Sequence, residues 1–321
     1  MKHIYLLLLA SALFFFCFEP ANAQPVKKHG NLSVQGTRMV DQNGIAVVLK
    51  GVSFGWHNWW PRFYNKETVK WLYKDWKCTV VRAAMGVEPD SGYLNEPQWS
   101  EKKMKAVIKG AIREDIYVIT DWHSHGLHLE GALTFFEEMA KKYGKYPHVI
   151  YEIYNEPVHQ SWQEVKDYSV EVIRKIREFD PDNIILVGSP HWCQDIHLVA
   201  DDPIEGFDNL MYTTHFYAAT HGQLLRDRGD YALEKGIPLY VSECAGMSAN
   251  GDGPIDYEAW YTWIDWMSRN EIGWICWSIA DKNETCSMLN ETADSKGGWK
   301  ETDLKESGIK TRELLRTGSL K

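Results

Sequence analysis

The sequence predicts an α/β protein built from eight repeated strand-and-helix units. Apolar, β-branched runs alternate strictly with amphipathic stretches from about residue 47 onward, which is typical of parallel strands alternating with helices. Eight such units are the number that a closed barrel requires. Polar and aromatic residues follow the strand runs, where barrel proteins place their functional face. We therefore expect a single (β/α)8 TIM barrel with a short N-terminal β-hairpin.

The first 23 residues are predicted to be a signal peptide. Lys2 supplies a positive charge, residues 4–18 are almost wholly apolar, and Ala21-Asn22-Ala23 places small residues at the cleavage position. The apolar run is short for a membrane span. We expect a secreted chain, extracellular or periplasmic, whose mature part forms one catalytic domain over residues 24–321, because no linker composition divides it.

Composition excludes several classes of protein. The formal net charge is -9, which disfavours nucleic acid as a partner but is compatible with a neutral polymer. No glycine-rich phosphate loop or nucleotide fingerprint is found, so no cofactor is implied. We expect a monomer that does not bind a membrane. Removing the leader takes Cys17 with it and leaves five cysteines; one disulfide is possible, but the sequence selects no pair.

Residues 32–48 are expected to form the hairpin. Leu32 and Val34 alternate with polar residues, and Asn43-Gly44 is a strong hairpin signal.

The barrel strands are assigned to runs that are rich in Val, Ile, Tyr and Trp and short enough for buried strands. They are predicted at residues 47–53, 78–84, 116–122, 148–154, 183–188, 210–216, 238–242 and 272–279.

The helices are assigned to the stretches in which apolar residues recur at helical spacing, as Trp260, Trp263 and Trp266 do. They are predicted at residues 65–75, 100–114, 131–143, 161–179, 222–235 and 256–270, with a final helix near 310–316. Turns such as Asp180-Pro181-Asp182-Asn183 are typical helix-to-strand connectors.

The residues at or just after each strand end form a candidate rim. Because the carboxyl ends of barrel strands share one face, these side chains should lie together. In strand order the rim comprises Trp56, His57 and Trp59; Arg82; His123 and His125; Asn155 and Glu156; Trp192; His215 and Tyr217; Glu243; and Trp277.

Glu156 and Glu243 are the candidate catalytic pair. Two carboxylates at the mouth of one barrel are what acid/base cleavage of a glycosidic bond requires. We expect burial to raise the pKa of Glu156, which suits a proton donor, and Asn155 to bind a sugar hydroxyl beside it. The structural alternative is that a glutamate before Pro157 caps a loop.

Arg82 is isolated in the apolar run Val80–Met85 and must find an acceptor. Glu243 is its expected partner, since a nucleophile has to stay ionised, and Tyr217 can donate a second hydrogen bond. The alternative is a structural Arg–Glu pair, and the two roles are compatible.

Rim tryptophans provide flat rings on which sugars stack. Trp56, Trp59, Trp60, Trp192 and Trp277 fall at rim positions, although each alone is about as well explained by the core.

His123, His125 and His128 raise an alternative. A His-x-His pair at a barrel strand end can hold a metal, but amidohydrolase barrels place that pair after the first strand. Here it follows the third, so we expect no metal.

Six segments together resemble glycoside hydrolase family five, particularly its endo-β-1,4-glucanase branch. They are residues 80–85, 121–125, 149–157, 214–217, 241–243 and 277–284, and the similarity spans the mature chain.

The resemblance implies a retaining mechanism with Glu156 as acid/base and Glu243 as nucleophile. Retention requires carboxyl groups ~5–5.5 Å apart, against ~6.5–9.5 Å for inversion. It also implies a cis peptide bond between Trp277 and Ser278. The substrate-binding residues implied are Arg82, His123, Asn155, Trp192, His215, Tyr217, Trp277, Lys282 and Trp56.

The expected function is hydrolysis of internal β-1,4-glucosidic bonds in cellulose or a related β-glucan polysaccharide or oligosaccharide. Two alternatives stay open: a β-mannanase or xyloglucanase with the same fold and mechanism, and a non-catalytic carbohydrate-binding protein. Cys244-Ala245-Gly246 and residues 56–60 depart from the family pattern, so the preferred polysaccharide is less firmly predicted than the reaction.

Overall fold

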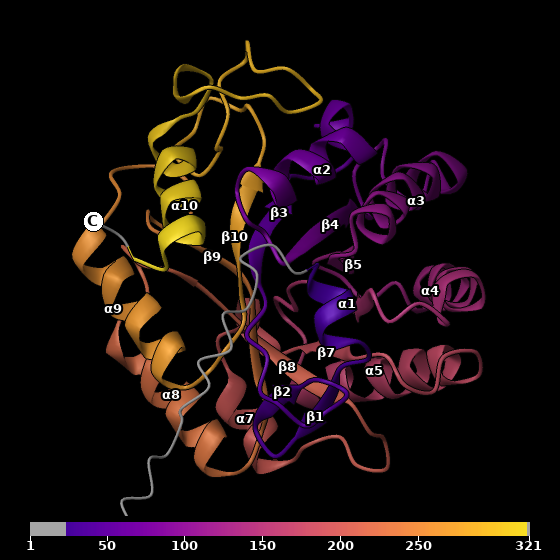
Figure 1. Cartoon of the computed structure of the whole chain (residues 1–321). Helices are drawn as coiled ribbons and strands as arrows, with labels where there is room; N and C mark the ends of the chain where they lie inside the picture. Colours follow the sequence, from indigo (N-terminus) through magenta and orange to yellow (C-terminus); the bar gives the residue numbers. More distant parts are fainter. Residues whose placement is uncertain (1–23, 320–321) are drawn as a thin grey trace, which may run out of the picture.

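Eight parallel strands close into a barrel, and helices surround it in the computed structural model (Figure 1). The structure describes residues 24–319. The strand order is β10-β3-β4-β5-β6-β7-β8-β9, so each strand pairs with its neighbours in the sequence and the last closes on the first. The predicted TIM barrel is therefore confirmed. The predicted signal peptide, residues 1–23, lies outside the described residues.

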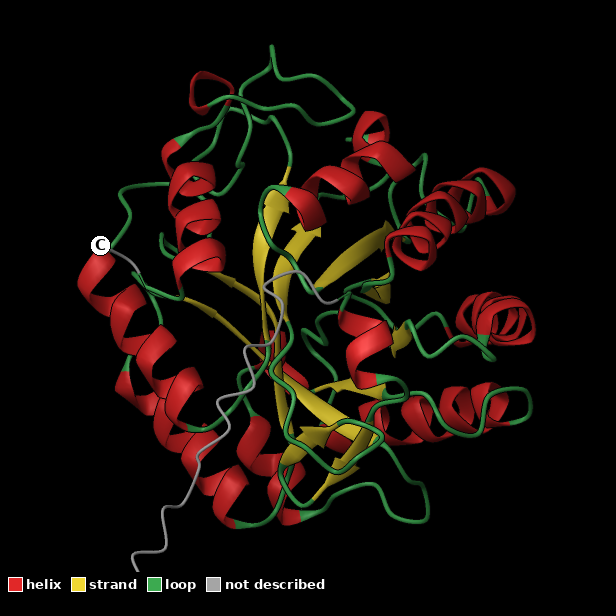
Figure 2. Ribbon diagram, viewed as in Figure 1, coloured by secondary structure: helices red, strands yellow, loops and turns green. Residues whose placement is uncertain are grey.

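The barrel strands are short and buried because the sheet is covered on both faces (Figure 2). Every residue of β4, β5 and β8 is buried. The strands are β3 (Lys50–Phe54), β4 (Val80–Gly86), β5 (Tyr117–His123), β6 (Val149–Glu152), β7 (Ile185–Gly188), β8 (Leu210–Tyr217), β9 (Leu239–Ala245) and β10 (Trp274–Ile279).

The helices pack their apolar stripes against the outside of the sheet. Two begin with strong side-chain caps: Asn65 accepts hydrogen bonds from two backbone amides, and Ser161 forms a capping box with Glu164. The helices after the first barrel strand are α2 (Lys66–Lys74), α3 (Pro97–Glu114), α4 (Leu129–Tyr143), α5 (Trp162–Arg177), α6 (Pro190–Cys193), α7 (Ile196–Asp201), α8 (Gln223–Glu234), α9 (Tyr257–Arg269) and α10 (Glu306–Thr317).

The connection between β7 and β8 differs from the other units. It holds the two short helices α6 and α7 in place of one long helix, and the sequence predicted neither of them. Their four and six residues are too few to show a helical period. The final helix, α10, is longer than predicted at its amino end.

An N-terminal segment closes the amino-terminal end of the barrel (Figure 1). It contains α1 (Pro25–His29) and the antiparallel pair β1 (Ser33–Gln35) and β2 (Arg38–Val40). Val34 N donates to Asn209 Oδ1 at 3.0 Å, just before β8, which fixes the hairpin there. The predicted Asn43–Gly44 turn is present, but it links β2 to a single bridge at Ala46. The groove described below lies at the opposite end of the barrel, at the carboxyl ends of the strands.

The inside of the barrel has two layers that follow each other along the same strands. We call the first the apolar layer: Val80, Ile119, Ile150, Leu186 and Met211, which belong to one buried hydrophobic cluster. We call the second the charged layer: Arg82, Asp121, Glu152, His215 and Glu243, all buried. Arg82, Asp121 and Glu152 each lie two residues beyond an apolar-layer residue, so strand alternation keeps them on the inner face.

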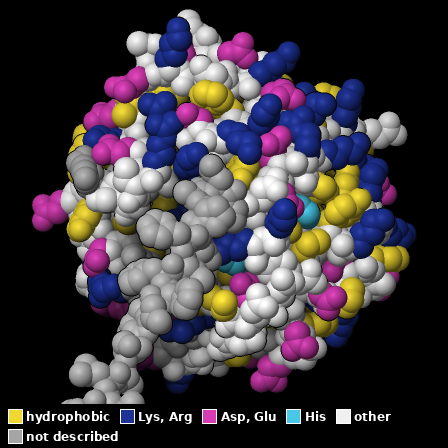
Figure 3. All heavy atoms as spheres, viewed as in Figure 1, with side chains coloured by type: hydrophobic (Ala, Val, Ile, Leu, Met, Phe, Trp, Pro, Cys, Tyr) yellow, Lys and Arg dark blue, Asp and Glu magenta, His cyan; other side chains and the backbone are white. Residues whose placement is uncertain are grey.

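The surface at the amino-terminal end carries mixed charges. Lys and Arg side chains are interspersed with Asp and Glu across the visible part of this face (Figure 3). Within residues 24–319 no helix is long and apolar enough to cross a membrane.

The described cysteines are all free and buried, so the disulfide that the sequence left open does not form among them. They are Cys78, Cys193, Cys244, Cys276 and Cys286.

Candidate active site

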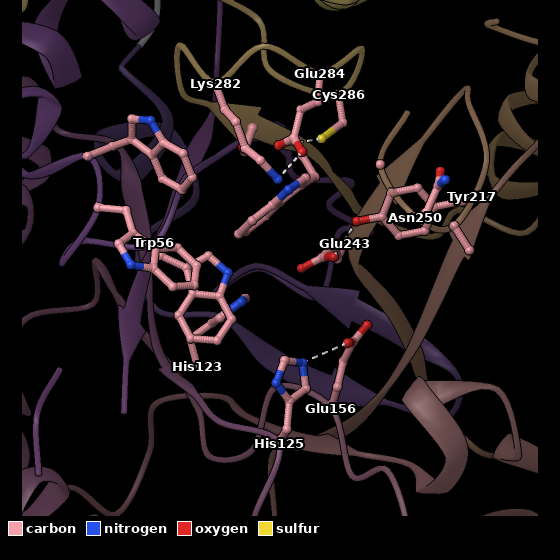
Figure 4. A pocket seen from close by; sticks show the side chains of 16 residues that line it. Trp56, His123, His125, Glu156, Tyr217, Glu243, Asn250, Lys282, Glu284 and Cys286 are labelled. Atoms are coloured by element: carbon pink, nitrogen blue, oxygen red, sulfur yellow. Dashed lines mark hydrogen bonds and ion pairs between the residues drawn. The ribbon is translucent and has the colours of Figure 1, made fainter. Parts of the chain in front are cut away.

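Glu156 and Glu243 face each other across the mouth of the barrel, as the sequence predicted (Figure 4). One carboxylate oxygen of each and one ring nitrogen of His215 all lie within 4.8 Å of one another. This is shorter than the ~6.5 Å at which inverting pairs begin. The pair can therefore act from two sides on one bond without a water between them.

Glu243 lies inside β9, two residues before its end, where the β8–β9 pairing is irregular. Arg82 Nη1 donates to its Oε2 at 3.0 Å, and the Tyr217 hydroxyl donates to its Oε1 at 2.7 Å. Both predicted partners are thus in place. The two hydrogen bonds fix the carboxylate plane and leave Glu243 5% exposed toward the groove.

Arg82 is surrounded by more acceptors than the sequence analysis expected. Its Nε and Nη2 donate to Glu152 at 2.7 and 3.2 Å, and Nη2 also lies 3.0 Å from Asp121. Burial alone would lower the pKa of Arg82, but these carboxylates and Glu243 raise it well above its ordinary value. The guanidinium is therefore a fixed positive charge beside the Glu243 carboxylate.

Asn155 completes the surroundings of Arg82. Its Oδ1 accepts from Nη2 at 2.6 Å, while its buried Nδ2 has no partner among the described residues. A buried amide donor without a partner is costly, and Asn155 lines neither arm of the groove, so its part in the described site is to accept from Arg82.

Glu156 lies in the loop that follows β6, four residues after the strand ends. His215 Nδ1 contacts its Oε1 at 2.9 Å, and His125 Nε2 contacts its Oε2 at 3.3 Å. Burial acts to raise the pKa of Glu156, as we expected, but these histidines outweigh it and the pKa lies below its ordinary range. The prediction of a raised pKa is therefore wrong for this structure.

His215 holds the proton that Glu156 lacks. Burial opposes its charged form, yet neighbouring anionic groups, Glu152 and Glu156 among them, raise the pKa of His215 well above 6.5. Its Nε2 contacts Ser242 Oγ at 2.8 Å, so both ring nitrogens have partners. Glu156, which is half-buried, and His215, which is buried, are therefore in direct contact with pKa values shifted in opposite directions.

His123 is held neutral beside the pair. Burial, and then the charge of Arg82, lower its pKa to about 3, and its Nδ1 contacts Asp121 at 2.7 Å. The ring stacks on Trp277, with centroids 5.1 Å apart, and meets the edge of Trp56. His123 thus forms part of the aromatic floor of the groove.

The metal alternative finds no support in how the histidines are used. His123 and His125 are engaged by Asp121 and Glu156, and His128 lies 3.2 Å from Glu88. Within residues 24–319, none of the three joins a group of three side chains at metal-ligand spacing.

The groove has two arms that meet at the catalytic pair. We call the cavity of about 300 Å³ the tryptophan arm: Trp56, Trp59, Trp60 and Trp277 line it, with Lys282 and Glu284. We call the cavity of about 510 Å³ the histidine arm: His125, His215 and His221 line it, with Trp192 and Gln194. Glu156, Tyr217 and Glu243 line both arms. A chain molecule lying along the groove would pass the two carboxylates at its middle.

The backbone shapes each arm. His191, Trp192 and Cys193 all have positive φ, and this turn leaves Trp192 38% exposed in the histidine arm. In the tryptophan arm the Trp277–Ser278 bond is cis, as the resemblance implied.

Three predicted rim residues, His57, Arg82 and Asn155, are buried and line neither arm of the groove. His57 is fully buried; its Nδ1 accepts from Gly86 N and its Nε2 contacts Ser100 Oγ. Position after a strand does not reveal whether a side chain turns toward the groove or under it.

Sequence reasoning missed Glu152 and Asp121, which lie at the centre of the site. The signal was available for Glu152, because it interrupts an apolar run as Arg82 does. Asn250 and Glu284, which also line the tryptophan arm, come from loops without a strand-end signal.

Comparison with known proteins agrees with this geometry. Residues 40–283 match the family model "Cellulase (glycosyl hydrolase family 5)". Endoglucanase 5 of Pectobacterium carotovorum subsp. carotovorum is 41% identical over 309 residues, which cover 94% of this chain and 61% of that protein.

Two solved structures share the fold closely. A structure from Cytophaga hutchinsonii has a TM-score of 0.90 and 46% identity, covering 92% of this chain and 97% of that one. The catalytic domain of Thermobifida fusca endoglucanase Cel5A (E5), in a variant complexed with cellotetraose, has a TM-score of 0.87 and 32% identity, covering 92% and 100%.

Proposed function

Because the chain belongs to the cellulases of glycosyl hydrolase family 5, we propose that it is a retaining endo-β-1,4-glucanase. Its substrate would be cellulose or a related β-glucan, cleaved at internal bonds. The observation that carries the proposal is the convergence of Glu156 and Glu243 within 4.8 Å at the mouth of the barrel.

The first step forms a covalent intermediate. A Glu243 oxygen attacks the anomeric carbon, the glycosidic C–O bond breaks, and Glu156 gives its proton to the departing oxygen. The fixed charge of Arg82 and the Tyr217 hydroxyl orient the attacking carboxylate.

The second step releases the sugar. Water attacks the same carbon, Glu156 accepts its proton, and Glu243 leaves as a carboxylate, which restores the original configuration.

The proton for the first step resides on the Glu156–His215 pair. The pKa of Glu156 lies below its ordinary value and that of His215 above, which supports a proton held mainly on His215 Nδ1, 2.9 Å from Glu156 Oε1. As negative charge develops on the departing oxygen, the proton moves from His215 to Glu156 and onward. One residue stores the proton and the other delivers it.

The two arms support action within a chain. Because both extend from the catalytic pair, sugar units can bind on either side of the bond that breaks. Aromatic rings and a few polar groups suit a neutral polymer of flat sugars.

We further propose that the chain is exported through residues 1–23. The charged start, apolar run and small residues before Gln24 support this.

The test is parallel hydrolysis of carboxymethylcellulose, glucomannan and xyloglucan by the purified chain. We expect the highest rate on carboxymethylcellulose, with viscosity falling before many reducing ends appear, and the β-anomer released first by NMR. A faster rate on glucomannan or xyloglucan would overturn the substrate, and release of the α-anomer first would overturn retention. Binding without turnover would indicate a carbohydrate-binding protein.

A further inference from the structure

Glu152 is a fully buried carboxylate at the end of β6 that the proposed reaction does not use. It is one of three acidic side chains around Arg82, and its two oxygens hold the Nε–Nη2 edge of the guanidinium at 2.7 and 3.2 Å. This contact turns the remaining nitrogen, Nη1, toward Glu243, which it meets at 3.0 Å. Glu152 therefore orients the group that orients the nucleophile.

The same carboxylate also reaches the other half of the reaction. Glu152 Oε1 lies 3.8 Å from His215 Nε2, while His215 Nδ1 contacts Glu156 at 2.9 Å. Ser242 Oγ is the direct hydrogen-bond partner of Nε2. Glu152 thus faces the histidine as a charge beside a neutral hydroxyl.

The titratable groups that face this region come from three strands, two loops and the short helix α6. Facing Glu152 and His215 are Arg82 (β4), Asp121 (β5), Tyr240 and Glu243 (β9), Glu156 (after β6), Cys193 (α6) and His221 (after β8). Tyr240 and Cys193 stay neutral because burial raises the pKa of both.

The pKa values of Glu152 and Asp121 are shifted in opposite directions, although both side chains contact Arg82. Burial acts to raise the pKa of Glu152, but Arg82 and His215 outweigh it and lower the value to about 2. Burial raises the pKa of Asp121 above its ordinary value, against the charge of Arg82. Of the two, Glu152 also lies close to His215, at 3.8 Å from Nε2.

We propose that Glu152 is a positioning residue whose single buried negative charge acts on both catalytic carboxylates at once, through Arg82 on Glu243 and through His215 on Glu156. This inference rests on the proposed hydrolase function.

The proposal has a specific consequence for pH dependence. A negative charge close to His215 makes the Glu156–His215 pair bind its proton more tightly. Removing that charge should lower the pH at which the pair loses its proton. The alkaline limb of the pH profile of kcat/KM should then move toward lower pH.

The experiment is the pH profile of kcat/KM on a soluble β-glucan for the wild type and for Glu152→Gln. We expect the alkaline limb of Glu152→Gln to move down by about one pH unit or more, because the variant removes a charge 3.8 Å from His215 Nε2. Thermal unfolding at each assay pH shows that the variant is folded.

Two further variants separate charge from packing. Asp121→Asn alters the other carboxyl contact of Arg82 but leaves Glu152 beside His215, so the alkaline limb should move by less than half as much as in Glu152→Gln. Glu152→Asp keeps the charge but shortens the contact, so kcat should fall while the limbs stay in place. If Glu152→Gln does not fold, the test is the pH profile of Glu152→Asp, whose limbs should stay in place while kcat falls.

Each outcome bears on the proposal. An alkaline limb of Glu152→Gln that does not move, or that moves to higher pH, would overturn it, as would a Glu152→Asp variant whose alkaline limb moves down. An equal displacement in Asp121→Asn would show that contact with Arg82, and not the charge beside His215, sets the profile. A wild-type chain without hydrolase activity would instead refute the proposed function.

Discussion

The apolar layer and the charged layer occupy the same barrel, yet burial stabilises the first and destabilises the second unless its charges are paired. Ile150 and Glu152 are two residues apart on β6, about 7 Å along the strand. Both are buried to 1% or less. Removing Ile150 from water is favourable, and close packing adds to this. Removing the Glu152 carboxylate from water is unfavourable, and its ion pair with Arg82 offsets the desolvation free energy.

This contrast shows why the site is confined to one end. A buried charge is tolerable where its partners are rigid and complete, and the charged layer supplies these partners from five strands. The apolar layer beneath it holds the strands at the spacing that those pairs need. Substitutions in the two layers should therefore affect different properties, which can be measured separately.

The largest effect should come from Glu243→Gln in the charged layer. The amide keeps the shape of the side chain but cannot act as the nucleophile, so kcat on a soluble β-glucan should fall by on the order of 10⁴-fold or more. The melting temperature should change by only a few degrees. Glu205→Gln makes the same substitution at an exposed position and serves as the control. Activity within tenfold of wild type would refute the role of Glu243.

In the apolar layer, Ile150→Ala should lower the free energy of unfolding by about 2–5 kcal/mol, because it leaves a cavity in a packed interior. The kcat of the folded fraction should stay within about twofold. Denaturant unfolding and initial rates on the same preparation measure the two effects. Ile45→Ala, at a side chain that is 60% exposed, should change stability by less than about 0.5 kcal/mol. A large loss of kcat without destabilisation would show that the layers are not separable.

His57 and His215 are both buried histidines, but the ring nitrogens of His57 contact Gly86 and Ser100 by hydrogen bonds, whereas a ring nitrogen of His215 contacts Glu156. Burial, and then the charge of Lys103, lower its pKa to about 3 in the folded protein, against about 6.5 when unfolded. Between these values the unfolded chain binds more protons, so stability falls as pH drops from 6.5 toward 3.

The His57→Gln variant removes this titration. Between pH 7 and 4.5 it should lose about 2–3 kcal/mol less stability than wild type. Urea unfolding at the two pH values measures the difference, and a constant packing cost cancels. His159→Gln, at an exposed position, is the control. An unchanged pH dependence in His57→Gln would mean that His57 is not neutral because of burial.

The smallest effect should come from the outer end of the tryptophan arm. Trp59 is 55% exposed, and its removal takes away a stacking surface far from the reacting bond. Trp59→Ala should raise KM for long oligosaccharides about fivefold, or about 1 kcal/mol, with kcat unchanged. Cellotriose and cellohexaose should be compared, and an equal effect on both would place Trp59 nearer the reacting bond than we propose.

Much of the barrel could be predicted because its signals are local. Runs such as Val80–Met85 are buried on both faces and so read as strands, and the helices between them show their own period. The two short helices α6 and α7 were not predicted, because turns with positive φ at His191 and Trp192 leave no periodic pattern in the sequence.

The candidate site followed from the same logic in part. Arg82 and Glu243 were expected to pair, because a lone charge in an apolar run must find a partner, and they do. The number of partners was not predictable: Glu152 and Asp121 join Arg82 only because β4, β5 and β6 lie side by side.

By itself the sequence determined the eight-unit barrel, the end that carries the site and the two carboxylates within it, since periodicity and the cost of burying charge act on each segment separately. Only the tertiary structure decided the direction in which the pKa of Glu156 is shifted. The pKa of Glu156 is lowered by His125 and His215, which lie 31 and 59 residues away in the chain but within 3.3 Å in space. Electrostatic energy depends on distance through space and on exclusion of water, and neither is set until the barrel closes.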